Sequence, residues 1–209
     1  MVYFPFFVRL EGRKGLIVGG GKTALGKAKR LLDYGPRLTV IAPEVLPELA
    51  NLSGVSVVSR TFRPADLDDS PTFVIAATND RQTNHEISLL CRERRLPVNV
   101  VDTPEDCTFL FPSLVRRGPL SIGISTGGAS PSGAIYIKNE ISHGLPDAIG
   151  EILYWLDNQR EPIKQSVGSE ETRKVIYQRL FERCLSLTRP LTPEETRNLI
   201  EAAERRNRQ

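Results

Sequence analysis

The feature that most constrains this chain is an apolar run that ends in three consecutive glycines. Residues 15–18 contain no polar side chain, which is typical of a strand buried on both faces of a parallel sheet. The glycines at 19–21 then impose a turn. Residues 23–34 predict a helix with apolar positions on one side and basic residues, Lys27 among them, on the other. This order of strand, glycine turn and helix favours an α/β fold.

Four further segments, at residues 38–42, 55–60, 73–78 and 97–101, predict strands, and a helix is expected over 80–94. Strands that alternate with helices form a parallel sheet with right-handed crossovers. We therefore expect a Rossmann-type α/β domain over residues 1–112.

The second half of the chain has a different pattern. Prolines and glycines between residues 104 and 119 interrupt the alternation, and residues 120–125 predict a strand outside the sheet. A second glycine turn at 126–131 precedes a helix that runs to about residue 141. Helices are expected from residue 146 onward, and a capping box at 192–195 starts the last of them. We expect a small α+β segment over 113–145 and a helical domain over 146–209.

Composition excludes several classes of protein. The formal charge of the 209 residues is only +3, and the basic residues are scattered among acidic ones, so nucleic acid binding is not expected. No apolar stretch approaches the roughly 20 residues of a membrane span. The three widely spaced cysteines indicate reduced thiols. We therefore expect a cytoplasmic protein that does not cross a membrane.

Residues 19–24 fit the dinucleotide-binding fingerprint G-x-G-x-x-G/A, placed after a strand and before a helix. Gly19 permits the tight turn, Gly21 lets the backbone approach a pyrophosphate, and Ala24 allows close packing. Lys22 and Thr23 complete the motif and are candidate cofactor contacts. The alternative is an ordinary glycine-rich turn between a strand and a helix.

The residues that follow the second predicted strand bear on which nicotinamide cofactor is bound, and we predict NAD. In most NAD sites an acidic residue near the end of this strand binds the ribose. Here Pro43 follows the strand and Glu44 is the only nearby carboxylate. The ribose is therefore recognised either by Glu44 or by backbone groups.

Ligands of open α/β sheets bind at the carboxyl ends of the strands. Thr78, Asn79 and Asp80 follow the fourth predicted strand, and residues 99–102 end the fifth. Both segments should lie beside the glycine turn. Asp102 is then a candidate general base; the alternative is a turn aspartate before a proline.

Three further features carry weaker signals. His85 and His143 are isolated from other potential ligands, so no metal site is predicted, and both are expected to be plain residues of a helix surface. The pair at 116–117 (RR) is either a contact for acidic groups of a ligand or a solvated basic turn.

The chain resembles the precorrin-2 dehydrogenase and sirohydrochlorin ferrochelatase family, the siroheme synthase module. The resemblance runs to about Glu140 and is carried by Phe6, Gly12, Arg13, residues 19–24, 76–80 and 99–104, Phe109, Pro112, Ser113, Pro119, Leu120 and residues 125–131. Such an ordered set is highly specific, whereas residues 146–209 match only loosely.

The resemblance implies NAD-dependent oxidation of precorrin-2 to sirohydrochlorin and, in bifunctional members, insertion of ferrous iron as a second substrate. Asp102 matches the key aspartate of the family. The resemblance also assigns tetrapyrrole contacts, and a homodimer that forms through residues 113–145 and shares its substrate cleft. The assigned contacts are Asn99, Ser125, Thr126, Gly127 and Lys138.

This chain departs from the family at several positions. Thr126 stands where a serine is common, and Ile135 stands where an arginine is common, which leaves Lys138 as the basic residue nearby. Thr23 and Gly26 replace a valine and an arginine. These changes favour, as one alternative, a dehydrogenase without chelatase activity. The other alternative is a regulatory protein that senses a nucleotide.

Overall fold

The computed structural model describes residues 3–207, and the chain divides into two compact units. The first ends at Phe111 and the second begins at Pro112. Each unit has its own hydrophobic core and is described by itself.

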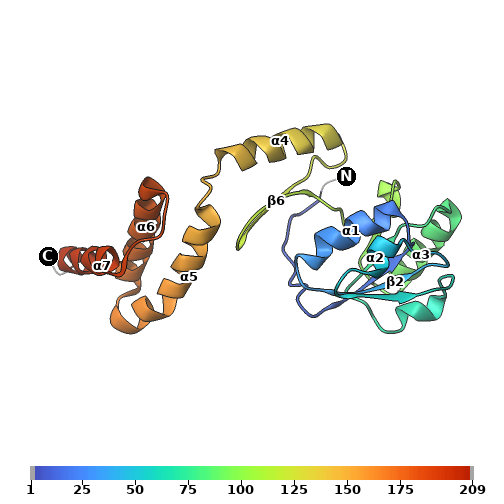
Figure 1. Cartoon of the computed structure of the whole chain (residues 1–209), viewed down its shortest axis with the longest axis horizontal. Helices are drawn as coiled ribbons and strands as arrows, with labels where there is room; N and C mark the ends of the chain where they lie inside the picture. The colour runs from blue at the N-terminus through green and yellow to red at the C-terminus, as the bar shows by residue number, and fades with distance from the viewer. Residues whose placement is uncertain (1–2, 208–209) are drawn as a thin grey trace. The chain divides into compact units, whose positions relative to one another are not determined.

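The first unit is built on one sheet of five parallel strands in the order β3-β2-β1-β4-β5. This arrangement confirms the predicted Rossmann-type fold (Figure 1). The strands are β1 (Lys14–Val18), β2 (Arg37–Ile41), β3 (Val55–Val58), β4 (Phe73–Ala76) and β5 (Val98–Val100). The α-helices are α1 (Lys22–Leu32), α2 (Pro47–Ala50) and α3 (Arg81–Glu93), with short 3₁₀ helices η1 (Pro64–Leu67) and η2 (Pro104–Asp106).

Alternating side chains of the strands form two core layers, because successive residues of a strand point to opposite faces. Leu16 and Val18 of β1 belong to the layer that α3 covers. Ile17 belongs to the other layer, which α1 and α2 cover. The sheet is therefore buried on both faces, as continuous apolar strands require.

The second unit begins with an antiparallel hairpin, β6 (Ser113–Arg117) and β7 (Leu120–Ile124), followed by α4 (Pro131–Gly144). The strand β6 was not predicted, because Val115 is its only buried residue and it contains no apolar run. The basic pair at 116–117 lies in this strand and not in a turn. At the hairpin turn Gly118 has φ +56°, and a Cβ there would lie 3.1 Å from the Cα of Gly150.

Three helices complete the second unit: α5 (Ile149–Ser166), α6 (Glu170–Leu187) and α7 (Pro193–Asn207). They enclose a core that includes Ile152, Ile176 and Leu180. The predicted capping box of α7 is confirmed, since the backbone nitrogen of Thr192 donates to Glu195 at 2.8 Å and the backbone nitrogen of Glu195 donates to Thr192 Oγ1 at 3.2 Å. Within residues 3–207 no helix is long and apolar enough to cross a bilayer.

Candidate dinucleotide site at the carboxyl edge of the sheet

The three glycines of the turn after β1 have different structural roles. Gly19 has φ +123°, and a Cβ there would lie 2.2 Å from the backbone oxygen of Ala77. A Cβ on Gly20 would lie 2.0 Å from the backbone oxygen of Glu44. Nothing lies within 4 Å of a Cβ built on Gly21. The first two glycines are therefore required by packing within the chain, whereas Gly21 faces open space.

The N-terminus of α1 points its backbone N–H groups toward this open space. Gly21 is the N-cap residue, no side chain caps the helix, and its first turn holds no acidic residue. The N–H of Gly19 is already bonded to the backbone oxygen of Ile41 at 2.9 Å, so it does not contribute to a ligand site. The unpaired donors at a helix N-terminus attract anions, and the helix dipole adds to this attraction.

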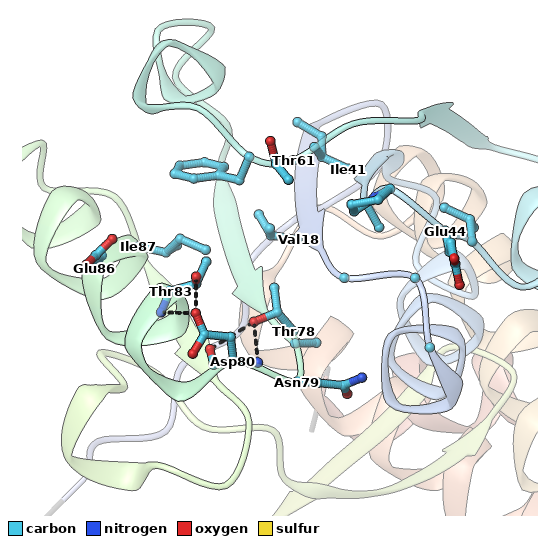
Figure 2. Close-up of a pocket in the computed structure, with 18 of the residues that line it drawn as sticks. Val18, Ile41, Glu44, Thr61, Thr78, Asn79, Asp80, Thr83, Glu86 and Ile87 are labelled. Carbon is cyan, nitrogen blue, oxygen red and sulfur yellow. Dashed lines mark hydrogen bonds between the residues drawn. The ribbon is translucent and has the colours of Figure 1, made fainter.

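A cavity of about 750 Å³ opens beside the turn. Its lining includes seven of the residues predicted to bind the cofactor, namely Gly19, Gly21, Pro43, Glu44, Thr78, Asn79 and Asp80. Figure 2 shows Thr78, Asn79 and Asp80 on one side of it and Glu44 on the other. Lys22 and Thr23 lie at the exposed start of α1 and are not part of this lining.

The charged side chains that line the cavity are all acidic. Glu44, Asp80 and Glu86 are the charged residues of its lining, which contains no lysine, arginine or histidine. A phosphate group bound here therefore meets no cationic side chain of the lining and depends on neutral donors, chiefly backbone N–H groups. The lining also disfavours an extra phosphate near Glu44, since like charges repel.

Hydrogen bonds hold the loop after β4 in place. The Thr78 hydroxyl donates to Asn84 Oδ1 at 2.7 Å, and Asn84 Nδ2 donates to the backbone oxygen of Thr78 at 3.0 Å. Asp80 caps α3 by accepting from the backbone nitrogens of Gln82 and Thr83. The hydrogen bond from the Thr83 hydroxyl is the main cause that lowers the pKa of Asp80. The sequence prediction missed Asn84, a buried polar residue of α3.

Asp102 lies at the same edge of the sheet but outside the cavity lining. Val18, Ala76 and Val100 are in register across β1, β4 and β5, so the segments that follow β1 and β5 leave the sheet together. Asp102 is exposed and has φ +58°, a left-handed conformation that aspartate tolerates better than most residues.

Asn99 is buried in β5, 5% exposed, and both ends of its amide are engaged. Nδ2 donates to the backbone oxygen of Phe109 at 3.0 Å, and Oδ1 accepts from Lys27 Nζ at 3.4 Å. Lys27 was expected on the outer side of its helix, but it is half-buried and lies over the ring of Phe111. The spacing of Ala24, Lys27 and Ala28 indicates this inward face, because residues three or four apart share one side of a helix.

His85 is not isolated, contrary to the prediction. Its Nδ1 lies 2.9 Å from Oδ2 of Asp106, and the backbone oxygen of Asp106 accepts a hydrogen bond from Ser88 at 2.6 Å. The pair joins α3 to η2. Among the described residues no group of three or more histidine, cysteine or acidic side chains is arranged to hold a metal ion.

The remaining predicted contacts belong to the second unit. The hydroxyl of Thr126 donates to the backbone oxygen of Ser130 at 3.0 Å and accepts from its backbone nitrogen at 3.1 Å. Ser125 accepts from the backbone nitrogen of Gly127 at 3.2 Å. These bonds shape the turn between β7 and α4. Lys138 is partly exposed on α4.

Two family models match the chain. The family described as "Putative NAD(P)-binding" matches residues 6–113, which include the whole parallel sheet. The family described as "Sirohaem biosynthesis protein central" matches residues 117–143, which include β7 and most of α4.

Similar proteins are known from several bacteria. The siroheme synthase of Thioalkalivibrio sulfidiphilus is 40% identical over 185 residues, which cover 87% of this chain and 38% of that protein. The siroheme synthase of Nitrosomonas eutropha is 37% identical over 186 residues, covering 87% and 39%. The chain thus spans about two fifths of the length of these relatives. The solved structure titled "SirC, precorrin-2 dehydrogenase" has the same fold, with a TM-score of 0.73, 24% identity and coverage of 97% of this chain and 100% of that one.

Proposed function

The chain belongs to the family described as "Putative NAD(P)-binding" and is 40% identical to a siroheme synthase over 87% of its length. We propose that it oxidises precorrin-2 to sirohydrochlorin with NAD as the hydride acceptor. More than half of its residues match the NAD(P)-binding model, so the first unit is a nicotinamide-dinucleotide-binding domain. The observation that carries the proposal is that the glycine turn and Asp102 leave the same edge of the sheet.

The residues of the turn fit a dinucleotide. The open space at Gly21 and the uncapped start of α1 leave room and donors for a pyrophosphate, which the rest of the cavity lining could not neutralise. The N–H groups at the start of α1 would hold the pyrophosphate, and the residues around Pro43 and Asn79 would enclose the remainder. When bound, NAD supplies a hydride acceptor.

NAD is proposed in preference to NADP. Glu44 is the carboxylate of the β2–α2 connection that lines the cavity, and no basic residue of the lining is available to pair with a 2′-phosphate. A carboxylate at this position accepts hydrogen bonds from ribose hydroxyls and repels a phosphate.

Asp102 is proposed as the general base. Conversion of precorrin-2 to sirohydrochlorin removes one hydride and one proton, and a carboxylate at the edge of the sheet is suited to accept the proton. Asp102 is exposed and has no ion-pair partner among the described residues, so it remains free to do so.

The chain is proposed to work as a homodimer through its second unit. Ile135, Tyr136 and Ile137 of α4 are 53%, 65% and 42% exposed, an unusual concentration of apolar surface on one helix. The family resemblance implies that a second copy of the chain covers this apolar surface. Sedimentation velocity should show a dimer for the native chain and a monomer for Tyr136→Glu.

The direct test of the proposed function is to mix the chain with precorrin-2 and NAD. We expect the sirohydrochlorin spectrum to appear together with one equivalent of NADH per tetrapyrrole, and a much slower reaction with NADP. Ferrous iron added afterwards tests the second reaction of bifunctional relatives. Binding of NAD without any oxidation of precorrin-2 would instead favour a nucleotide sensor.

A further inference from the structure

Lys27 is held at a defined place beside the end of β5. Its Nζ lies 3.4 Å from Oδ1 of Asn99 and 3.9 Å from the centroid of the Phe111 ring. The amide of Asn99 cannot turn without losing the hydrogen bond from Nδ2 to the backbone oxygen of Phe109. Its oxygen is therefore kept toward the lysine, and the ammonium group is held by two contacts.

This ammonium group has no carboxylate within ion-pair distance among the described residues. Burial is the main cause that lowers the pKa of Lys27, and Arg30 acts in the same direction, whereas Cys107 and Asp102 oppose it. A lysine carries three N–H donors, and Asn99 occupies one of them. A partly buried charge without a counter-ion gains free energy when an anion binds.

We infer that Lys27 binds a carboxylate of the tetrapyrrole substrate beside Asp102, and that Asn99 is a positioning residue for Lys27 and not a substrate contact. The inference rests on the proposed function, which supplies a substrate rich in carboxylates. The pyrophosphate of the dinucleotide is the other anion at this edge. Lys27 does not line the cavity beside the glycine turn, which favours the substrate.

The test is the dissociation constant of sirohydrochlorin, the proposed product, measured by titration of the full chain without NAD. Lys27→Met should weaken binding roughly ten- to a hundredfold, the equivalent of one charge-assisted hydrogen bond. Lys27→Arg should restore most of the affinity. Lys29→Met is the matched control, because this lysine of the same helix is exposed and pairs with Glu48 at 3.9 Å. Affinity for NAD should stay unchanged in all three variants.

A double-mutant cycle tests the role of Asn99. If Asn99 acts through Lys27, Asn99→Ala should weaken sirohydrochlorin binding in the native background and have little effect in the Lys27→Met background. Equal effects in both backgrounds would show that Asn99 acts independently and would overturn this part of the inference.

Other outcomes separate this inference from the proposed function. The role of Lys27 would be overturned if Lys27→Met bound sirohydrochlorin with native affinity, or if Lys27→Met and Lys29→Met lost equal affinity for it. A parallel loss of NAD affinity in Lys27→Met would overturn this role as well. In each case precorrin-2 oxidation by the native chain would still support the proposed function. If the native chain neither binds sirohydrochlorin nor oxidises precorrin-2, both fail together.

Discussion

The thiol of Cys107 lies 3.1 Å from the backbone nitrogen of Val100 and 3.2 Å from its backbone oxygen, so one side chain satisfies both polar groups of the last residue of β5. The same sulfur lies 3.4 Å from the backbone oxygen of Thr103. The thiol has one hydrogen to donate, so the backbone oxygens of Val100 and Thr103 share it, and Asp102 lies between these two residues in a left-handed conformation. Burial raises the pKa of Cys107, which keeps the thiol protonated and able to donate.

Replacement of Cys107 tests whether this anchor positions Asp102. Cys107→Val should lower the turnover number on the order of ten- to a hundredfold, because small displacements of a reacting group are costly. Cys107→Ser, which keeps a donor and an acceptor, should retain most of the activity. Steady-state kinetics of both variants provide the measurement, and equal activity in the two would show that the hydrogen bonds of the thiol do not matter.

Gly21→Ala separates ligand binding from folding. A methyl group at Gly21 meets no protein atom within 4 Å but occupies the space assigned to the pyrophosphate. We expect NAD affinity to fall by at least about tenfold with no loss of thermal stability. Gly26→Ala, on the same helix and also without steric obstruction, is the control. It should leave NAD affinity unchanged and stabilise the chain by about 0.5–1 kcal/mol. Equal NAD affinities in the two variants would place the cofactor elsewhere.

Glu44→Gln tests cofactor selectivity. Loss of the carboxylate should weaken NAD binding and reduce the preference for NAD over NADP by roughly tenfold, since a charged acceptor is lost and a like charge is removed. The measurement is the pair of dissociation constants for NAD and NADP. Glu86→Gln removes another carboxylate of the cavity lining and serves as the control. An equal change in selectivity in both variants would assign the effect to overall charge and not to Glu44.

The capping box of α7 makes the second unit sensitive to acid. The hydrogen bond from Arg189, followed by the one from the backbone of Thr192, lowers the pKa of Glu195 from its ordinary 4.5 to about 2. The unfolded chain therefore binds more protons between these values. The stabilisation is complete above pH 4.5 and is lost as the pH falls toward 2.

Thermal unfolding followed by the fluorescence of Trp155, the single tryptophan, reports on this unit. Glu195→Gln should flatten the fall in melting temperature between pH 4.5 and 2. Glu194→Gln, in the same helical turn but outside the capping box, should leave that fall intact. The account of the cap would be wrong if both variants behaved like the native chain.

The parallel sheet was predictable because its strands are short runs of apolar residues. Ile17 and Ile75 are fully buried, and their side chains mark the strands regardless of what packs against them. The strand β6 was not predictable in this way, since a hairpin with one buried residue leaves little periodicity to detect. The cofactor residues at the ends of β1 and β4 could be placed together because parallel strands end at one edge.

The site beside Asp102 was harder to predict because it depends on contacts between distant segments. Lys27 and Asn99 are 72 residues apart, and only the packing of α1 on the sheet brings them together. The pairing of His85 with Asp106 depends in the same way on how η2 folds back toward α3. Sequence patterns locate the face of a helix, but not which side chain of another strand meets it.

The most direct test of the central claim is the turnover of Asp102→Asn with saturating precorrin-2 and NAD. Asparagine has the size of aspartate and tolerates the same left-handed backbone, so only the basicity of the side chain is removed. We predict that the turnover number falls by about 10²- to 10⁴-fold while the dissociation constant of NAD stays the same. A variant that oxidises precorrin-2 at the native rate would contradict the account, because the proton would then be leaving to another group.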